Sequence, residues 1–208
     1  MAAPRPVAAG RAEPAQLRRS GRAHRAVLAA AIDLFETVGY PRLTIDAIAA
    51  RAGVSKATIY RWWPNKAAVV MEAFLATVEP DLAFPDSGST RDDLVEQAAA
   101  LSRLLTERRL GQLVLALLGE AQTDADLATA LRDGWQRPRR DAGREVLQRG
   151  VDRGELRPDC DSDLVLDGIY GPIYLRLLFG HAPLDRSDIR QFVDQALDRV
   201  TRGPSGDV

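Results

Sequence analysis

Residues 44–66 read TIDAIAARAGVSKATIYRWWPNK and are the most informative part of the chain. Thr44 has the side chain of a helix N-cap, and apolar residues follow it at helical spacing as far as Gly53. Glycine adopts a left-handed backbone freely, which suits the end of a helix. Ser55 can then cap a second short helix. The stretch therefore predicts two short helices joined by a tight turn.

The side chains of these two helices suit close packing against each other. Ala49 is small enough for the helices to approach, and Ile59 can fill the space between them. The second helix must then turn its polar groups outward, and these are Lys56, Thr58 and Arg61. Such groups bind DNA phosphates and base edges. The pattern is that of a helix-turn-helix whose second helix reads the major groove.

The distribution of charge is consistent with a nucleic-acid partner. The 208 residues carry a formal net charge of −1. Residues 1–70, however, hold eleven Lys and Arg against four Asp and Glu, so the acidic excess lies in the remainder. A basic segment on an acidic body is common among DNA-binding proteins, although chance clustering of charges gives the same count.

Helical periodicity extends over the rest of the chain, and no alternating strand pattern interrupts it. A helix is predicted from Gly21 to Gly39, and Asn65 and Asp124 are suited to cap later helices. Pro138 should kink or split the long pattern that follows Asp124. We therefore predict an all-α chain of about nine helices.

Residues 1–20 are rich in Ala, Pro and Arg and show no apolar period. Such a segment has too little apolar surface to bury, so we predict a disordered basic arm. The arm is either a solvated tail or a flexible contact to DNA phosphates and the minor groove.

Composition argues against several other classes of protein. Cys160 is the only cysteine and the two histidines lie far apart, so neither an intrachain disulfide nor a Cys/His zinc site is expected. The sequence has no Gly-rich phosphate loop, no Ser/His/Asp arrangement and no apolar run of membrane length. We therefore predict a cytoplasmic protein that is not an enzyme, with no catalytic residue, metal ligand, cofactor or membrane contact.

The ordered motif resembles the DNA-binding domain of the tetracycline-repressor (TetR) family. The resemblance is carried by Leu34-Phe35, Gly39 and residues 44–66, about 45 residues in all. The chain departs from the family pattern at Trp62 and Trp63, where the family more often has Tyr or His and then Phe. Both changes keep an aromatic ring, but an indole can donate a hydrogen bond and not accept one, which affects a phosphate contact at position 62.

The resemblance implies DNA contacts for nine residues: Thr44, Ser55, Lys56, Ala57, Thr58, Tyr60, Arg61, Trp62 and Lys66. Thr44 and Tyr60 would donate to phosphates, and Lys66 would pair with one. Residues 55–58 and Arg61 would face the major groove, where Arg61 or Lys56 suits a guanine.

Several of these positions also have a purely structural interpretation. Thr44 and Ser55 can act as caps whether or not they touch DNA. Tyr60 can instead be a buried wedge and Arg61 solvated surface. Trp63 is expected in the core, and Trp62 stays open between core and contact.

The second half of the chain resembles the family more loosely, in residues 135–140, 150–156 and 170–174. The resemblance implies that the last two long helices, expected at residues 162–180 and 187–201, form a homodimer. It also implies a cavity for a small-molecule effector of unknown identity. The candidate cavity walls are Trp135, Tyr170, Tyr174 and Phe179, each of which can equally be an ordinary core aromatic.

Together these expectations describe a sequence-specific transcriptional regulator, a repressor that a small-molecule effector releases from a palindromic double-stranded DNA operator. We divide the chain into the arm (residues 1–20), the reader (residues 21–67, a three-helix helix-turn-helix domain) and a regulatory and dimerisation domain (residues 68–203). Two alternatives remain: a helical interaction protein whose helix-turn-helix binds no DNA, and a DNA-binding activator.

Overall fold

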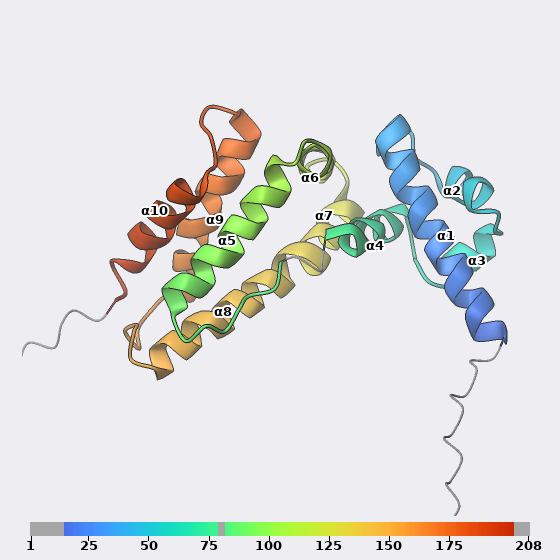
Figure 1. The fold of residues 1–208 in the computed structure, drawn as a ribbon. Helices are drawn as coiled ribbons and strands as arrows, with labels where there is room; N and C mark the ends of the chain where they lie inside the picture. Colours follow the sequence, from blue (N-terminus) through green and yellow to red (C-terminus); the bar gives the residue numbers. More distant parts are fainter. Residues whose placement is uncertain (1–14, 79–81, 202–208) are drawn as a thin grey trace, which may run out of the picture.

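The computed structural model describes residues 15–78 and 82–201 (Figure 1). This part of the chain is built from α-helices, which confirms the predicted all-α class. The helices are α1 (Ala15–Val38), α2 (Ile45–Ala52), α3 (Lys56–Tyr60), α4 (Lys66–Val78), α5 (Thr90–Thr106), α6 (Arg108–Glu120), α7 (Ala125–Leu131), α8 (Arg137–Asp152), α9 (Ser162–Phe179) and α10 (Arg186–Leu197). A π-helical turn, Arg132–Gln136, joins α7 to α8. Within the described ranges, no helix is both long and apolar enough to cross a membrane.

The first helix begins earlier than the sequence predicts. It starts at Ala15, so residues 15–20 belong to α1 and not to the arm. Their sequence, AQLRRS, consists mainly of good helix formers, which lets the helix extend beyond its apolar stripe. The helix ends before Gly39, which has a φ of 76°. The other arm residues, 1–14, lie outside the described part of the chain.

The reader is a small bundle in which α1 packs against α2, and α1 also packs against α4, the helix that follows the reader. Its core holds Val27, Phe35, Ile48 and Ile59, which are all buried. Each fully buried aliphatic or aromatic side chain of this size contributes about 1.5–3 kcal/mol. This packing fixes the two short helices of the turn against the longer α1.

The regulatory domain is built around α5. This helix contacts α6, α8, α9 and α10, and both its apolar and several of its polar side chains are buried. Figure 1 shows an elongated molecule with α2 and α3 at one end and α10 at the other. Helix α4 leaves the reader and reaches α7, so it joins the two halves.

The π turn splits the long pattern that follows Asp124. The amide of Arg137 donates to the carbonyl of Arg132, five residues back, one residue more than in an α-helix. The split lies directly before Pro138, which has no amide hydrogen to continue an α-helical ladder. The structure therefore has two helices where the sequence predicted one long pattern kinked or split at Pro138, and the split accounts for a tenth α-helix in the described residues.

Candidate nucleic-acid interface and ligand cavity

The turn between α2 and α3 has the capping geometry that the sequence predicts. The Thr44 hydroxyl accepts a hydrogen bond from the Ala47 amide at 3.1 Å, and the Ser55 hydroxyl accepts one from the Thr58 amide at 3.2 Å. Gly53 ends α2 with a φ of 67°, a left-handed conformation that glycine adopts without strain. The caps end and restart the helix within three residues, which places α3 across α2.

The inner side of this turn is apolar and the outer side is open to solvent. Ile59 is fully buried and Ala49 almost so. The candidate contact residues lie outward: Thr44, Ser55, Lys56, Ala57, Tyr60 and Arg61 are exposed, whereas Thr58, Trp62 and Lys66 are partly buried. Tyr60 is 55% exposed, so it is not a buried wedge.

Two cations on the outer side each contact a neighbouring side chain. The Lys56 ammonium lies 2.8 Å from an Asp46 carboxylate oxygen, and this hydrogen bond raises the pKa of Lys56. Both groups are exposed, so water screens the pair and a phosphate can replace the carboxylate. The Arg61 guanidinium lies 4.7 Å from the centre of the Trp62 ring, a cation–π contact that orients it.

The residue after Trp62 anchors the end of α3. Trp63 is buried, and its indole N–H donates to Glu72 Oε2 at 2.6 Å. The imidazole of His24 stacks on Trp63 with ring centres 4.8 Å apart, and its Nε2 lies 2.9 Å from Glu72 Oε1. The cluster ties α1, α3 and α4 together. The expectation that Trp63 belongs to the core is confirmed, while the role of His24 was not foreseen.

A second cluster joins the reader to α7. The Lys66 ammonium donates to the Tyr40 carbonyl at 3.1 Å and lies 4.1 Å from the centre of the Tyr40 ring. The Tyr40 hydroxyl donates to Asp124 Oδ2 at 3.1 Å. Asp124 also caps α7 by accepting from the Leu127 amide, and this bond is the main cause of its lowered pKa. Burial raises the pKa of Tyr40, so its hydroxyl stays protonated as a donor.

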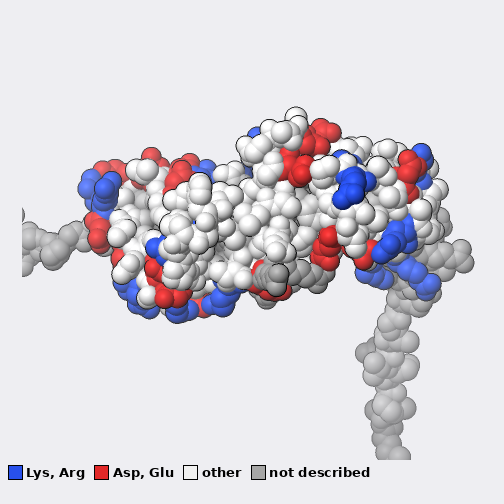
Figure 2. All heavy atoms as spheres, turned by 90° about the horizontal axis from the view of Figure 1, so that it is seen from above, with Lys and Arg blue, Asp and Glu red and all other residues white. Residues whose placement is uncertain are grey.

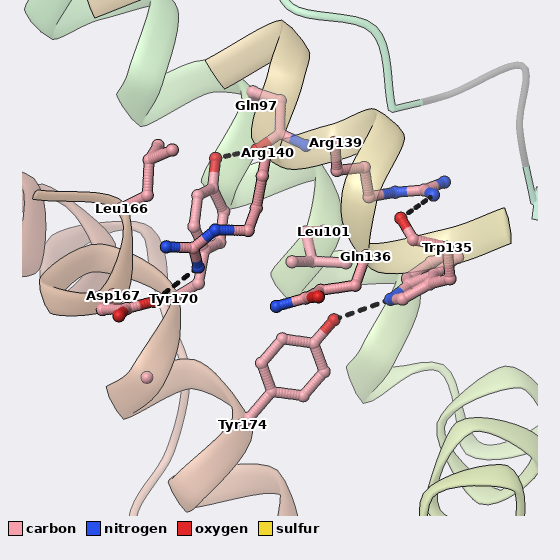
Figure 3. A pocket seen from close by; sticks show the side chains of 11 residues that line it. Gln97, Leu101, Trp135, Gln136, Arg139, Arg140, Leu166, Asp167, Tyr170 and Tyr174 are labelled. Carbon is pink, nitrogen blue, oxygen red and sulfur yellow. Dashed lines mark hydrogen bonds and ion pairs between the residues drawn. The ribbon is translucent and has the colours of Figure 1, made fainter. Parts of the chain in front are cut away.

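A cavity of about 190 Å³ lies between α5, α8 and α9 (Figure 3). Its walls are Gln97, Leu101, Trp135, Gln136, Arg139, Arg140, Leu166, Asp167, Tyr170, Gly171 and Tyr174. Three of the four candidate aromatics therefore meet there. The fourth, Phe179, does not: it is 73% exposed at the end of α9, beside His181. It follows Tyr174 by five residues, which turns its side chain to a different side of the helix.

Six of the cavity's polar side chains are paired with one another. The Trp135 indole donates to the Tyr174 hydroxyl at 3.0 Å, and the Tyr170 hydroxyl donates to the Gln97 side-chain oxygen. Burial raises the pKa of both tyrosines, so both remain neutral. At the rim, Arg140 bonds Asp167 at 2.5 Å (Figure 3). The cavity thus offers aromatic walls, two hydroxyls and the two side-chain amides of Gln97 and Gln136 to a ligand.

Two family models match the chain. "Bacterial regulatory proteins, tetR family" covers residues 27–73, and "Tetracyclin repressor-like, C-terminal domain" covers residues 84–196. The helix-turn-helix-type transcriptional regulator YdeS of Bacillus subtilis is 44% identical over 85% of this chain and 89% of its own. The chain belongs to the TetR family of transcriptional regulators.

Two further relatives agree with this assignment. The DNA-binding transcriptional repressor TetR of Mycobacteroides abscessus is 34% identical over 83% of this chain and 90% of its own. The crystal structure of the TetR-family regulator SCO0332 superimposes with a TM-score of 0.72 at 38% identity, covering 87% of this chain and all of that one. As a member of this family, the protein is a DNA-binding helix-turn-helix regulator.

In this TetR-family chain, the cavity touches the helix that leads to the reader. The Trp135 ring packs against Phe74 of α4, with ring centres 5.0 Å apart. Beside it, a Cβ added at Gly134 would lie 3.3 Å from Leu75 and 3.4 Å from Met71, so the π turn approaches α4 closely. One residue, Trp135, therefore lines the cavity and contacts α4.

The charged side chains differ between the two ends of the molecule. Figure 2 shows acidic and basic groups intermixed over the α9 and α10 end, while basic groups gather beside the start of α1. Two of the basic groups at the reader end are Arg22 and Arg25, which are exposed on α1. These cations add to those of α3 on the end of the molecule that would face DNA.

Proposed function

We propose that this protein is a cytoplasmic homodimeric repressor that binds a palindromic operator through α3 and leaves it when a small-molecule effector occupies the cavity. The observation that carries the proposal is the position of Trp135, which bonds Tyr174 inside the cavity and packs on Phe74 of α4. The repressor named among the relatives supports repression over activation.

The outer side of the turn supports the proposed DNA contact. Lys56 and Arg61 are exposed cations on α3, and Tyr60 beside them is an exposed hydroxyl donor. We assign Arg61 to a base edge, because its guanidinium is oriented by Trp62 and matches the two acceptors of guanine. Thr44 and Tyr60 would contact phosphates, which fix the register without reading sequence.

The outer face of α9 supports the proposed dimer. Leu164, Leu175, Leu178 and Phe179 are each at least half exposed. Exposed apolar side chains gathered on one helix are typical of a surface that a partner covers. A two-fold dimer presents two readers to half-sites one helical turn, about 34 Å, apart.

Release requires that the effector prefers one arrangement of α4 over the other. A ligand that shifts a two-state equilibrium must bind one state more tightly by a few kcal/mol. A ligand that breaks the Trp135–Tyr174 bond or displaces the Trp135 ring would change the support under Phe74. Helix α4 would then move and change the spacing of the two readers.

The test uses an operator recovered by selection from random DNA, labelled for fluorescence anisotropy. A panel of small aromatic and polar compounds is screened for thermal stabilisation of the protein, and hits are added to the protein–operator complex. We expect at least one hit to lower operator affinity tenfold or more in the wild type and much less in Trp135→Phe. Hits that stabilise the protein and leave operator affinity unchanged would refute release by an effector.

The alternatives make different predictions in the same experiments. An activator would bind the same kind of operator but raise transcription of a template in vitro. An interaction protein with an idle helix-turn-helix would recover no sequence from random DNA. The exposed Lys56 and Arg61 favour DNA binding over the second alternative.

A further inference from the structure

The mouth of the cavity opens on the outer face of α9. Three of its wall residues are exposed, Gln136 on the π turn and Asp167 and Gly171 on α9, and a Cβ added at Gly171 would meet no atom within 4 Å. Counting from Leu164, positions 171, 175 and 178 follow at steps of seven, four and three, which lie on one side of a helix. The mouth and the exposed leucines of α9 therefore share one face.

The large and small side chains on this face are arranged so that two copies of the face can fit against each other. Leu164 and Leu178 lie seven residues before and after Gly171, and Gly168 and Leu175 lie close on either side of it. If two copies of α9 cross antiparallel at Gly171, the two Gly171 positions meet, Leu164 meets the second copy's Leu178, and Leu175 lies over the second copy's Asp167, next to Gly168. Each contact away from the axis then occurs twice, as a two-fold axis requires.

Charge and area are compatible with such a crossing. The charged rim residues Asp167 and Arg140 pair with each other at 2.5 Å and so carry little net charge to the face. An 18-residue helix is about 27 Å long and 10–12 Å wide, so α9 alone offers about 300 Å², and the 12-residue α10 brings the total to about 500 Å². This is more than half of the roughly 800 Å² per partner of a stable interface, to which neighbouring loops would add.

We propose that a second copy of this chain crosses α9 at Gly171 and covers the mouth, so that the cavity is closed only in the dimer. This inference rests on the homodimer of the proposed function and specifies the position of its axis and its effect on the cavity. Exchange between cavity and solvent would be slow in the dimer and fast in the monomer. By linkage, a molecule held in the closed cavity would also oppose dissociation of the dimer.

The position of the axis is tested by crosslinking the full chain in a Cys160→Ser background. Helix axes 8–10 Å apart leave facing Cα atoms about 3.4–5.4 Å apart, which overlaps the range that a disulfide spans. We expect Gly171→Cys to form covalent dimers on mild oxidation. Leu164→Cys should not, because its two copies lie about 21 Å apart along the helices. Combining Leu164→Cys with Leu178→Cys should restore the crosslink.

Closure of the mouth is tested by thiol labelling in the same background. Gln136→Cys places a thiol at the cavity wall, and Gln148→Cys places one on the exposed side of α8 as the matched control. With a maleimide reagent, we expect Gln136→Cys to react at least tenfold more slowly than Gln148→Cys in the dimer. Dilution until the dimer dissociates should remove this difference.

The possible failures are distinguishable. Sedimentation of the wild-type chain reports whether it dimerises at all, so a monomer at high concentration would overturn the homodimer itself and this inference with it. A dimer in which Gly171→Cys does not crosslink, or in which Gln136→Cys reacts as fast as Gln148→Cys, would overturn this inference and leave the proposed repressor intact.

Discussion

The reader and the cavity differ in how their residues are distributed along the chain. The candidate DNA contacts all lie within residues 44–66: Thr44 caps α2, Ser55 caps α3, those from Lys56 to Trp62 lie on α3 or directly after it, and Lys66 begins α4. The cavity draws its walls from α5, the π turn, α8 and α9, between Gln97 and Tyr174. A surface built from one local motif is visible in sequence, whereas a cavity depends on how distant helices pack. The predictions below test this difference, starting with the largest expected effect.

The buried side chains of the reader should contribute more to the free energy of unfolding than its exposed side chains. Replacing the fully buried Ile59 by Ala should lower the free energy of unfolding by about 2–4 kcal/mol, because it leaves a cavity under a five-residue helix. Urea unfolding followed by circular dichroism measures the change. The neighbouring exposed Tyr60→Phe is the control and should change stability by less than about 0.5 kcal/mol. Equal effects would contradict the assignment of inner and outer sides.

The exposed side should in turn dominate DNA recognition. Arg61→Ala should weaken binding to the selected operator by about 1–3 kcal/mol, roughly 5–150-fold, and relax the preference at one base position. Binding to unrelated DNA should fall far less. Competition binding against operators changed at single positions measures this. A uniform loss at every position would instead assign Arg61 to a phosphate.

The link between the cavity and α4 should appear as an energetic coupling. In a double-mutant cycle of Phe74→Leu and Trp135→Leu, the coupling free energy should be about 0.5–1.5 kcal/mol, the range for contacting aromatic rings. The control cycle pairs Phe74→Leu with Phe192→Leu, whose ring lies against Arg176 instead. That cycle should be additive within about 0.5 kcal/mol. If both double-mutant cycles were additive, the proposed coupling from the cavity to the reader through Trp135 and Phe74 would be refuted.

Breaking the Tyr40–Asp124 hydrogen bond should have the smallest effect on stability, and that effect should depend on pH. Tyr40→Phe removes one hydrogen bond to a partly exposed carboxylate and should cost about 1 kcal/mol or less at pH 7. The pKa of Asp124 is lowered in the folded state, so its contribution is complete above its unfolded pKa of about 3.9. That contribution is lost as pH falls through the folded pKa. The difference between wild type and Tyr40→Phe should therefore shrink below pH 4, which unfolding at several pH values would show; a constant difference would exclude the ionised pair.

Sequence reasoning succeeded where the physical cause is local. The caps at Thr44 and Ser55 and the glycine at position 53 act over three or four residues, so their pattern could be read directly. The start of α1 was placed too late because the apolar stripe begins after the helix does. A helix can continue on intrinsic propensity alone, without an apolar face.

The cavity was predicted only in part, for a reason that is equally physical. Helical spacing groups Tyr170 with Tyr174 but does not say what they face, and Phe179 proved to lie outside the cavity. Gln97 was missed, although a glutamine within an apolar helix stripe is a visible signal of a buried polar partner. The Tyr40–Asp124 contact joins residues 84 positions apart, and nothing in either local pattern indicates it.

The most direct test of the central claim, that residues 44–66 read a symmetric DNA site, is selection of binding sequences from a random DNA pool. The winning sequence is then bound at several salt concentrations. We predict a two-fold symmetric winner with half-sites about one helical turn apart, and an affinity that falls steeply with salt because each reader neutralises several phosphates. No enrichment, or an enriched sequence bound with no dependence on salt, would contradict the account and favour a helical interaction protein.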